Sequence, residues 1–202
     1  MRTKFLYQNL YAISPTLCYN RPAMQIDALL KVKSQVRPAT IDSTFFRHVM
    51  RKFATGVTVL TVRDGETVHG MTANAFASVS LSPTLVLVCI ERGNTTHALV
   101  SRAGSFAMNI LSAEQELLAK RFAKQIAVPA DPFADLAYHP AATGAPILDD
   151  CLAYVDCRVV AAHDAGDHTI FVGQVEAAGF GRARDAEPLL WLDGEYKSLP
   201  RE

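Results

Sequence analysis

Short runs of apolar residues, alternating or continuous, recur along most of the chain and predict a fold dominated by β-strands. Strands are expected at residues 57–63, 67–72, 76–80, 85–90, 106–111, 151–162, 169–180 and 189–192. Asp64-Gly65, between the first two runs, is a strong hairpin signal. Because no β-α-β unit repeats, the pattern favours a mainly β fold, a mostly antiparallel barrel with peripheral helices.

Helical spacing of apolar residues is confined to a few short segments. Residues 41–56 predict a helix that packs against the core and ends at Gly56, because one face carries Phe45, Phe46, Val49, Met50 and Phe53. A short helix is expected at residues 95–101. Ser112-Ala-Glu-Gln115 has the form of a capping box and predicts a helix through Ala123. Residues 124–146 are rich in Pro, Ala and Asp and predict a long loop.

The first 40 residues differ in charge from the rest of the 202-residue chain. They hold six basic residues and one acidic residue, whereas the remainder holds 14 basic and 19 acidic residues. We expect residues 1–40 to be an N-terminal extension, either disordered or the result of a start assigned upstream of Met24. A mitochondrial-type presequence is an alternative. Residues 41–202 are long enough to form one domain with a full core.

Charge, hydropathy and cysteine spacing narrow the class of protein. The formal net charge is zero, which argues against nucleic acid as the main partner. No apolar run approaches the roughly 18 residues needed to span a bilayer, so we expect no membrane association. The four cysteines show no CxxC pair and no metal-ligand spacing, which favours a reducing compartment and a cytoplasmic protein.

None of the familiar catalytic motifs occurs. The chain has no GxGxxG after a strand, no Walker motif, no GxSxG and no HExxH, and its six histidines are scattered. We therefore expect no metal site and name no catalytic acid or base. An enzyme with this sequence would take its chemistry from an organic cofactor.

The most informative stretch is residues 70–83, Gly-Met-Thr-Ala-Asn-Ala-Phe-Ala-Ser-Val-Ser-Leu-Ser-Pro. It sets small side chains with hydroxyl and amide groups between two apolar strands. Taken alone, a polar strand and turn is the simpler interpretation. The density of short donors and acceptors also suits the edge of a flat ligand such as an isoalloxazine ring, and the alternating alanines would let such a ring approach the backbone.

Three further features are candidate binding elements. Residues 91–96, Glu-Arg-Gly-Asn-Thr-Thr, precede a short helix and suit either a phosphate or a capped turn. Residues 166–168, Gly-Asp-His, occupy a hairpin turn, where the histidine is either solvated or a contact for a nicotinamide. Tyr196 is either a core aromatic or a stacking surface.

These segments, in this order, resemble the flavin reductase-like family, the short-chain NAD(P)H:flavin oxidoreductases that serve two-component monooxygenases. The resemblance covers roughly residues 42–199. Its signatures are Phe53-Ala-Thr-Gly-Val-Thr-Val-Leu-Thr61, residues 70–83, Leu85-Val-Leu-Val-Cys89, Phe106-Ala-Met-Asn-Ile-Leu111, Gln115 to Ala123, Gly166-Asp-His168 and Pro188-Leu-Leu-Trp191 to Tyr196. It implies an FMN-binding split β-barrel that forms a homodimer, with flavin near the subunit interface.

The resemblance also implies roles for individual residues. The flavin ring and ribityl chain would lie along Thr72, Ala73, Asn74, Ala75, Phe76, Ser78 and Val79. The phosphate side would be held by Arg92, Gly93, Asn94 and Thr95, and the site closed by Phe122 and Ala123. The nicotinamide side would hold Asp167, His168 and Tyr196. Relatives often carry serine and a basic residue where this chain has Gly93 and Asn94, so the choice between FMN and FAD stays open.

The implied activity is reduction of FMN or FAD by NADH or NADPH, with a flavin-dependent monooxygenase as the recipient of the reduced flavin. Hydride would pass directly from nicotinamide to flavin, with the protein supplying orientation and hydrogen bonds. A non-catalytic flavin- or heme-binding protein on the same barrel is an alternative, because a fold does not fix a function. A flavin-bound oxidase of small amines, or a tightly flavinylated monooxygenase, either of which would oxidise its substrate without a second protein, is a third interpretation.

Overall fold

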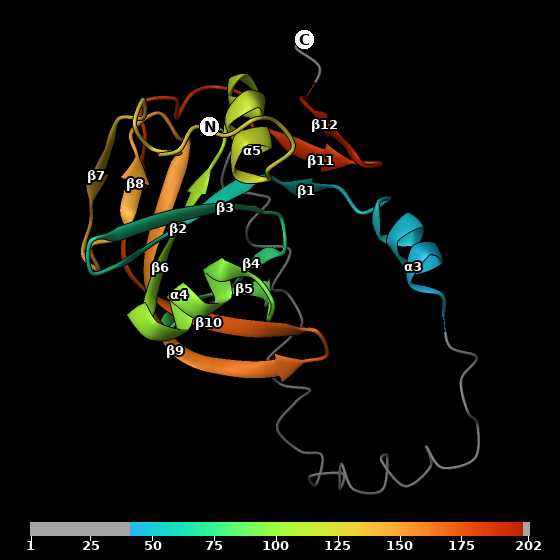
Figure 1. The fold of residues 1–202 in the computed structure, drawn as a ribbon, viewed down its shortest axis with the longest axis horizontal. Helices are drawn as coiled ribbons and strands as arrows, with labels where there is room; N and C mark the ends of the chain where they lie inside the picture. Colours follow the sequence, from blue (N-terminus) through green and yellow to red (C-terminus); the bar gives the residue numbers. More distant parts are fainter. Residues whose placement is uncertain (1–40, 200–202) are drawn as a thin grey trace, which may run out of the picture. The chain divides into compact units, whose positions relative to one another are not determined.

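Seven antiparallel strands form the main sheet of this computed structural model, which describes residues 41–199. The predicted extension, residues 1–40, lies outside the described residues. The strands run in the order β3-β2-β6-β9-β10-β5-β4 (Figure 1). Their bounds are β2 Thr58–Asp64, β3 Thr67–Ala73, β4 Phe76–Leu81, β5 Thr84–Glu91, β6 Ser105–Ile110, β9 Ala153–Ala165 and β10 His168–Phe180. The antiparallel, mainly β architecture predicted from the sequence is therefore confirmed.

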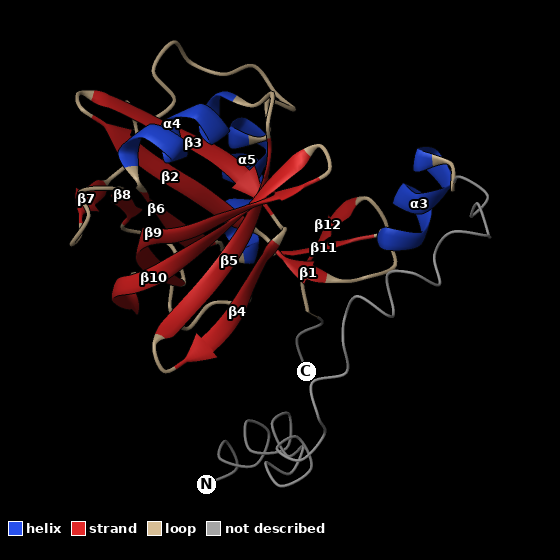
Figure 2. Ribbon diagram, turned by 90° about the horizontal axis from the view of Figure 1, so that it is seen from below, coloured by secondary structure: helices blue, strands red, loops and turns tan. Residues whose placement is uncertain are grey.

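The two edge strands of this sheet are consecutive in the chain. β3 ends at Ala73 and β4 begins at Phe76, so only Asn74 and Ala75 connect the two edges. Figure 2 shows the strong twist that carries the sheet round from one edge to the other. The edges are not hydrogen-bonded to each other, which leaves the barrel split at this junction.

Smaller elements lie around the main sheet. A three-stranded sheet consists of β1 (Thr55–Gly56), β11 (Leu190–Leu192) and β12 (Glu195–Lys197), and a two-stranded one of β7 (Tyr138–Pro140) and β8 (Pro146–Leu148). The helices are α3 (Ser43–Met50), α4 (Thr95–Ala103) and α5 (Glu116–Phe122). A 3-10 turn at Ala113–Gln115 precedes α5, and Ser112 and Gln115 form the predicted capping box there.

Four expectations need correction. The first helix ends at Met50 instead of Gly56, because Gly56 belongs to β1 and pairs with Leu190. None of its residues is buried, so it does not pack on the core of its own chain. The predicted loop at 124–146 contains β7, and the 163–168 connection shrinks to the turn Gly166-Asp167, because β9 and β10 pair as far as Ala165 and His168.

Apolar side chains on the two faces of the sheet form the two larger of three buried clusters in the described part of the chain. Leu60 packs inside with Val88, Phe106 and Met108. On the opposite face Val59 packs with residues of α5 and the C-terminal segment, namely Phe122, Leu189 and partly buried Trp191. Successive side chains of β2 point to opposite faces of the sheet, so this strand contributes residues to both clusters. The second cluster holds α5 and the C-terminal segment against the sheet.

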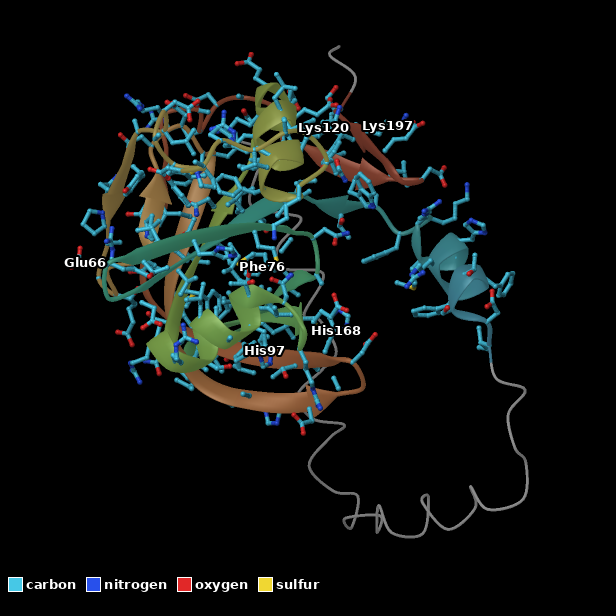
Figure 3. The ribbon with its side chains drawn as sticks, in the orientation of Figure 1. Glu66, Phe76, His97, Lys120, His168 and Lys197 are labelled. Atoms are coloured by element: carbon cyan, nitrogen blue, oxygen red, sulfur yellow. The ribbon has the colours of Figure 1, made fainter. Side chains whose placement is uncertain are left out.

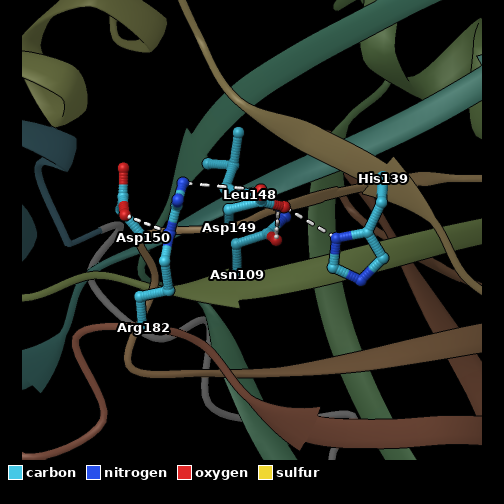
Figure 4. A network of polar contacts seen from close by, with 6 residues as sticks. All are labelled: Asn109, His139, Leu148, Asp149, Asp150 and Arg182. Atoms are coloured by element: carbon cyan, nitrogen blue, oxygen red, sulfur yellow. Dashed lines mark hydrogen bonds and ion pairs between the residues drawn. The ribbon is translucent and has the colours of Figure 1, made fainter.

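A polar network joins the β7–β8 hairpin to the barrel (Figure 4). The buried Asn109 amide donates to the Val59 carbonyl at 3.0 Å and accepts from the Leu148 N–H at 2.8 Å. Asp149, next along the chain, lies 2.7 Å from His139 Nδ1 and 3.4 Å from an Arg182 nitrogen. These bonds satisfy a buried amide and fix the segment that follows β8.

Two further properties bear on function. Within residues 41–199, no helix has the length and apolar character needed to cross a membrane. Nor do three or more potential metal ligands gather anywhere in the same range.

Candidate functional site

The junction between the edge strands is held from both sides. The Cys89 N–H of β5 donates to the Ala75 carbonyl at 3.0 Å, and the Thr58 hydroxyl of β2 donates to the Ala73 carbonyl at 2.6 Å. The Asn74 amide donates to the Thr55 hydroxyl at 3.2 Å. Asn74 is therefore presented at a fixed place, next to strand edges whose remaining N–H and C=O groups have no strand partner.

An aromatic cavity of about 210 Å³ opens on one side of this junction. We define it by its lining residues, Val57, Thr72, Asn74, Ala123, Gln125, Trp191 and Tyr196. Trp191 and Tyr196 are cross-strand partners in β11 and β12, with ring centroids 4.9 Å apart in an edge-to-face arrangement. The turn Asp193-Gly194 sets this register, because both residues have positive φ, as a tight hairpin requires.

A polar cavity of about 250 Å³ adjoins the aromatic cavity, and Thr72 and Ala123 line both. Its lining residues are His69, Gly70, Met71, Thr72, Asn94, Thr96, Phe122, Ala123 and Lys124. β3 forms its floor, and Figure 1 shows β3 running between α5 and α4. Asn94 caps α4 by accepting a hydrogen bond from the Thr96 N–H at 3.0 Å. The two cavities together form a groove that is aromatic at one end and polar at the other.

His69 belongs to the polar end of this groove. Its Nε2 lies 3.0 Å from the Thr96 hydroxyl, which links β3 to the first turn of α4. Burial lowers the pKa of His69, and the nearby charge of Lys124 lowers it further. His69 is therefore neutral at neutral pH and takes part as a hydrogen-bonding group.

The end of α5 is fixed against β3 by two contacts. The Thr72 hydroxyl donates to the Ala119 carbonyl at 2.6 Å. The Phe122 ring lies where a side chain on Gly70 would be, since a Cβ there would come within 2.6 Å of the ring. Gly70 thus lets the Phe122 ring lie close against the strand, and this contact helps to set the position of Ala123 in both cavities.

A third, apolar cavity of about 330 Å³ lies beyond Asn74. It is lined by Met50, Phe53, Thr55, Asn74, Ala75, Phe76, Ala77, Leu87 and Cys89. Burial raises the pKa of the Cys89 thiol, which keeps it protonated at neutral pH. This cavity therefore offers an apolar surface without charge.

Comparison with known proteins identifies the family. The family described as "Flavin reductase like domain" matches residues 50–200. This chain belongs to the flavin reductase-like family. It is 41% identical to "FMN reductase (NADH) SmoA" of Agrobacterium fabrum over 165 residues, 82% of this chain and 91% of that protein. It is 35% identical to "Flavin-dependent monooxygenase, reductase subunit HsaB" of Mycobacterium tuberculosis over 164 residues, 81% of this chain and 86% of that one.

The structural comparison agrees with the sequence comparison. The solved structure described as "Flavin reductase PheA2 in native state" matches with a TM-score of 0.73 and 41% identity, over 80% of this chain and all of that chain. The split-barrel fold predicted from the sequence is therefore confirmed for this flavin reductase-like chain.

Several of the predicted flavin residues lie together in the groove. The aromatic cavity contains Thr72, Asn74 and Ala123, and also Tyr196, which the family resemblance assigns to the nicotinamide side. Asn94 and Phe122 line the polar cavity, while Ala75 and Phe76 line the apolar one.

The other predicted residues lie outside these three cavities. Ala73 is buried, and Ser78 and Val79 are exposed on β4. Gly93 and Thr95 flank Asn94 without lining a cavity, and the Arg92 guanidinium is paired with Asp164 at 2.9 Å.

Asp167 and His168 lie apart from the groove within one chain. Their side chains are 2.7 Å apart, and this hydrogen bond lowers the pKa of Asp167. Figure 3 shows His168 at the end of the β9–β10 hairpin, well separated from Lys197, the neighbour of Tyr196. The predicted nicotinamide residues are therefore not gathered into one place by a single copy of the chain.

Eight residues that line the groove are not among the site residues predicted from the sequence, namely Val57, His69, Gly70, Met71, Thr96, Lys124, Gln125 and Trp191. A sequence signal exists for Trp191. The Asp193-Gly194 turn, taken as a two-residue hairpin loop, pairs Trp191 with Tyr196. Lys124 and Gln125 follow Phe122 and Ala123, which the family resemblance assigns to the site, but no pattern of their own indicates them, because they reach the groove only through the packing of α5 on β3.

Proposed function

We propose that this protein is an NADH-dependent flavin reductase that supplies reduced flavin to a separate monooxygenase component. Membership of the family and the names of its relatives SmoA and HsaB support the reaction and the partner. The single structural observation that carries the proposal is the groove along β3, in which an aromatic and a polar cavity adjoin at Thr72 and Ala123.

The groove fits a phosphorylated flavin by its chemistry. The aromatic cavity offers the flat faces of Trp191 and Tyr196 together with the amide of Asn74. The polar cavity offers Thr96, the capped start of α4 and the cation of Lys124. A planar ring at the first end and an anionic phosphate at the second would each meet suitable groups.

In this proposal the side chains orient reactants and do not transfer protons. A bound flavin supplies the redox chemistry, accepting hydride from NADH. Asn74 and the backbone at the split edge would donate hydrogen bonds to the ring edge, and Thr72 fixes the strand through its bond to Ala119. The low-polarity wall formed by Val57 and Trp191 excludes water from the ring. NADH as reductant makes the cytoplasm the expected location.

The proposed active form is a homodimer. Helix α3 exposes the apolar side chains Phe46, Val49 and Met50, and Phe53 follows it, all at about half exposure or more. Such a face is typical of a protein interface. Asp167 and His168 would then complete the nicotinamide side from the second copy, since within one chain His168 lies apart from Lys197, the neighbour of Tyr196.

Anaerobic mixing of the purified protein with NADH and FMN or FAD tests the proposal. We expect rapid bleaching of the flavin absorbance, and with NADPH a slower reaction. Absence of bleaching with every combination of flavin and nicotinamide would refute a reductase. In a second, aerobic assay, oxygenated product that forms from an added organic substrate only when a flavin-dependent monooxygenase is also present would support the partner assignment.

A further inference from the structure

The cation expected for a flavin phosphate is not where the sequence pattern puts it. Arg92 precedes α4, but its guanidinium is paired with Asp164 of the β9–β10 hairpin, and Arg92 does not line the polar cavity. Lys124, immediately after α5, does line it. The positive charge at this end of the groove therefore comes from the residue that follows Ala123, and not from residues 91–96, which the sequence pattern suggests for a phosphate.

Lys124 is the one permanently charged residue among those that line the polar cavity. Its side chain forms no ion pair or hydrogen bond with any residue in the described range 41–199. Its neighbours Lys120 and Arg121, by contrast, are paired with Glu116 and Asp135. His69, which faces Lys124, is neutral because burial and Lys124 itself lower its pKa. The cavity thus holds an uncompensated positive charge.

The backbone conformation at Lys124 fixes the place from which its charged side chain extends. Lys124 has φ of 56°, in the left-handed region that non-glycine residues rarely adopt. The Lys124 N–H bonds to the Arg121 carbonyl at 3.0 Å, and the Gln125 N–H bonds to the Lys120 carbonyl at 2.9 Å, so the end of α5 is closed around this residue. Glycine is the residue favoured at such a position. The chain instead keeps a long cationic side chain there.

The wall opposite Lys124 also favours an anion. It is the first turn of α4, a nine-residue helix capped by Asn94, with the Thr96 hydroxyl bonded to His69. Free backbone N–H groups at a helix start attract negative charge, and a lysine ammonium adds charge-assisted hydrogen bonds. Lys124 and the start of α4 both line the polar cavity above β3. This cavity adjoins the aromatic cavity, because Thr72 and Ala123 line both.

We propose that Lys124 binds the phosphate group of the flavin and makes the protein select phosphorylated flavins over riboflavin. This inference rests on the proposed flavin site and adds its specificity-determining residue. The phosphate is recognised by its charge, so FMN and FAD both qualify, whereas riboflavin, with the same ring and no phosphate, loses the contact.

The test compares FMN with riboflavin in the full-length protein and in Lys124→Gly. Dissociation constants are measured by quenching of flavin fluorescence, and kcat and KM for each flavin with NADH. We expect Lys124→Gly to weaken FMN binding about 10-fold or more, the range of a lost charged hydrogen bond, and to leave riboflavin binding unchanged. Glycine suits the left-handed backbone, so the unfolding temperature should not fall. Lys124→Arg should restore most of the preference.

Two further variants separate the alternatives. Arg102→Gln removes one positive charge from the far end of α4, where Arg102 pairs with Asp64, and should leave the ratio of FMN to riboflavin affinity unchanged. If Arg92→Gln lowers that ratio and Lys124→Gly does not, Arg92 is the phosphate cation and the inference is wrong.

The remaining outcomes are equally decisive. Equal losses for both flavins in Lys124→Gly, or no loss for either, would contradict a phosphate contact at Lys124. A wild-type protein that binds and reduces riboflavin as well as FMN would overturn the selectivity while leaving the reductase assignment intact. A wild-type protein that binds no flavin at all would remove both proposals.

Discussion

At the scale of single residues, the proposed flavin site is lined by side chains that we expect to position the ligand. Trp191 is held edge-to-face against Tyr196 by the β11–β12 register and lines the aromatic cavity. Tyr196 is half-buried, and burial is the main reason that its pKa is raised. Its phenol therefore stays protonated over the whole physiological range, and in the proposed site it would serve as a surface and a hydrogen-bonding group.

Replacing Trp191 with Ala should weaken flavin binding because it removes one wall of the cavity. We expect the dissociation constant for FMN to rise roughly 10-fold, consistent with the energy of a lost aromatic contact. Fluorescence titration measures it. Trp191→Phe should retain most of the affinity, and Phe180→Ala, at an exposed aromatic on β10, should leave it unchanged. Equal effects of Trp191→Ala and Phe180→Ala would show that Trp191 does not contact the ligand.

Residues 70–76 show how much of the site local sequence patterns can predict. Short polar side chains between two apolar strands indicate Thr72 and Asn74 as site residues, and both line the groove. No such pattern indicates Lys124, because a lysine that follows a helix is usually exposed to solvent. Its place in the cavity depends on Phe122 lying against Gly70, 52 positions earlier in the chain, and local patterns do not report such contacts.

At the scale of elements, the groove depends on how closely α5 approaches β3. Gly70→Ala would put a Cβ 2.6 Å from the Phe122 ring and force the end of α5 away from the strand. We expect a loss of about 1–3 kcal/mol in unfolding free energy and weaker FMN binding, because Ala123 and Lys124 move with the helix. Denaturant unfolding and flavin titration measure the two effects.

Gly173→Ala is the matched control for Gly70→Ala. A Cβ there would meet Phe106 at 2.7 Å, inside the barrel and away from the groove. It should cost similar stability and leave the affinity for FMN unchanged. If both variants weaken FMN binding equally, the effect of Gly70→Ala comes from general destabilisation and not from displacement of α5.

Arg121 of α5 forms an ion pair with Asp135 in the loop that follows this helix, and this pair contributes to stability in a pH-dependent way. Two guanidinium nitrogens lie 2.6 and 3.0 Å from the two carboxylate oxygens of Asp135. The hydrogen bond from Arg121 is the largest cause that lowers the pKa of Asp135. A lowered carboxyl pKa means that this contribution is full above the ordinary value of about 3.9 and is lost as the pH falls through the lowered value.

Asp135→Asn should therefore lower the unfolding temperature slightly at neutral pH. The difference from the wild type should stay constant down to about pH 4 and shrink below it, as the wild-type carboxylate takes up a proton. Thermal unfolding of both proteins across this pH range measures the difference. A gap that widens on acidification would contradict the assigned ion pair.

At the scale of the whole molecule, α3 shows the limit of prediction from one chain. Helical spacing of its apolar residues predicts the helix correctly, but periodicity says only that one face is apolar and not what covers it. In the structure that face is exposed, so the inferred packing on the core of the same chain was wrong. A second copy is the cover that we propose.

Val49→Asp should accordingly break the proposed homodimer, since it places a charge in the middle of the apolar face of α3. Sedimentation velocity should show a dimer for the wild type and a monomer for the variant. The KM for NADH should rise in the monomer, because His168 would no longer reach the groove of the other copy. Leu117→Asp, at an exposed leucine on α5, is the control and should stay dimeric. A monomeric, fully active wild type would exclude this arrangement.

The split between β3 and β4 has a consequence for the behaviour of the protein in a crowded cell. Open strand edges are where sheets of different molecules join and aggregate. On β4 a bulge between Ser78 and Ser80 interrupts the regular pairing with β5, and such irregularity discourages an approaching strand. At Asn74 and Ala75 no bulge protects the gap, and a ligand seated there would do so instead. The supply of flavin would then govern how long the protein survives as well as how fast it works.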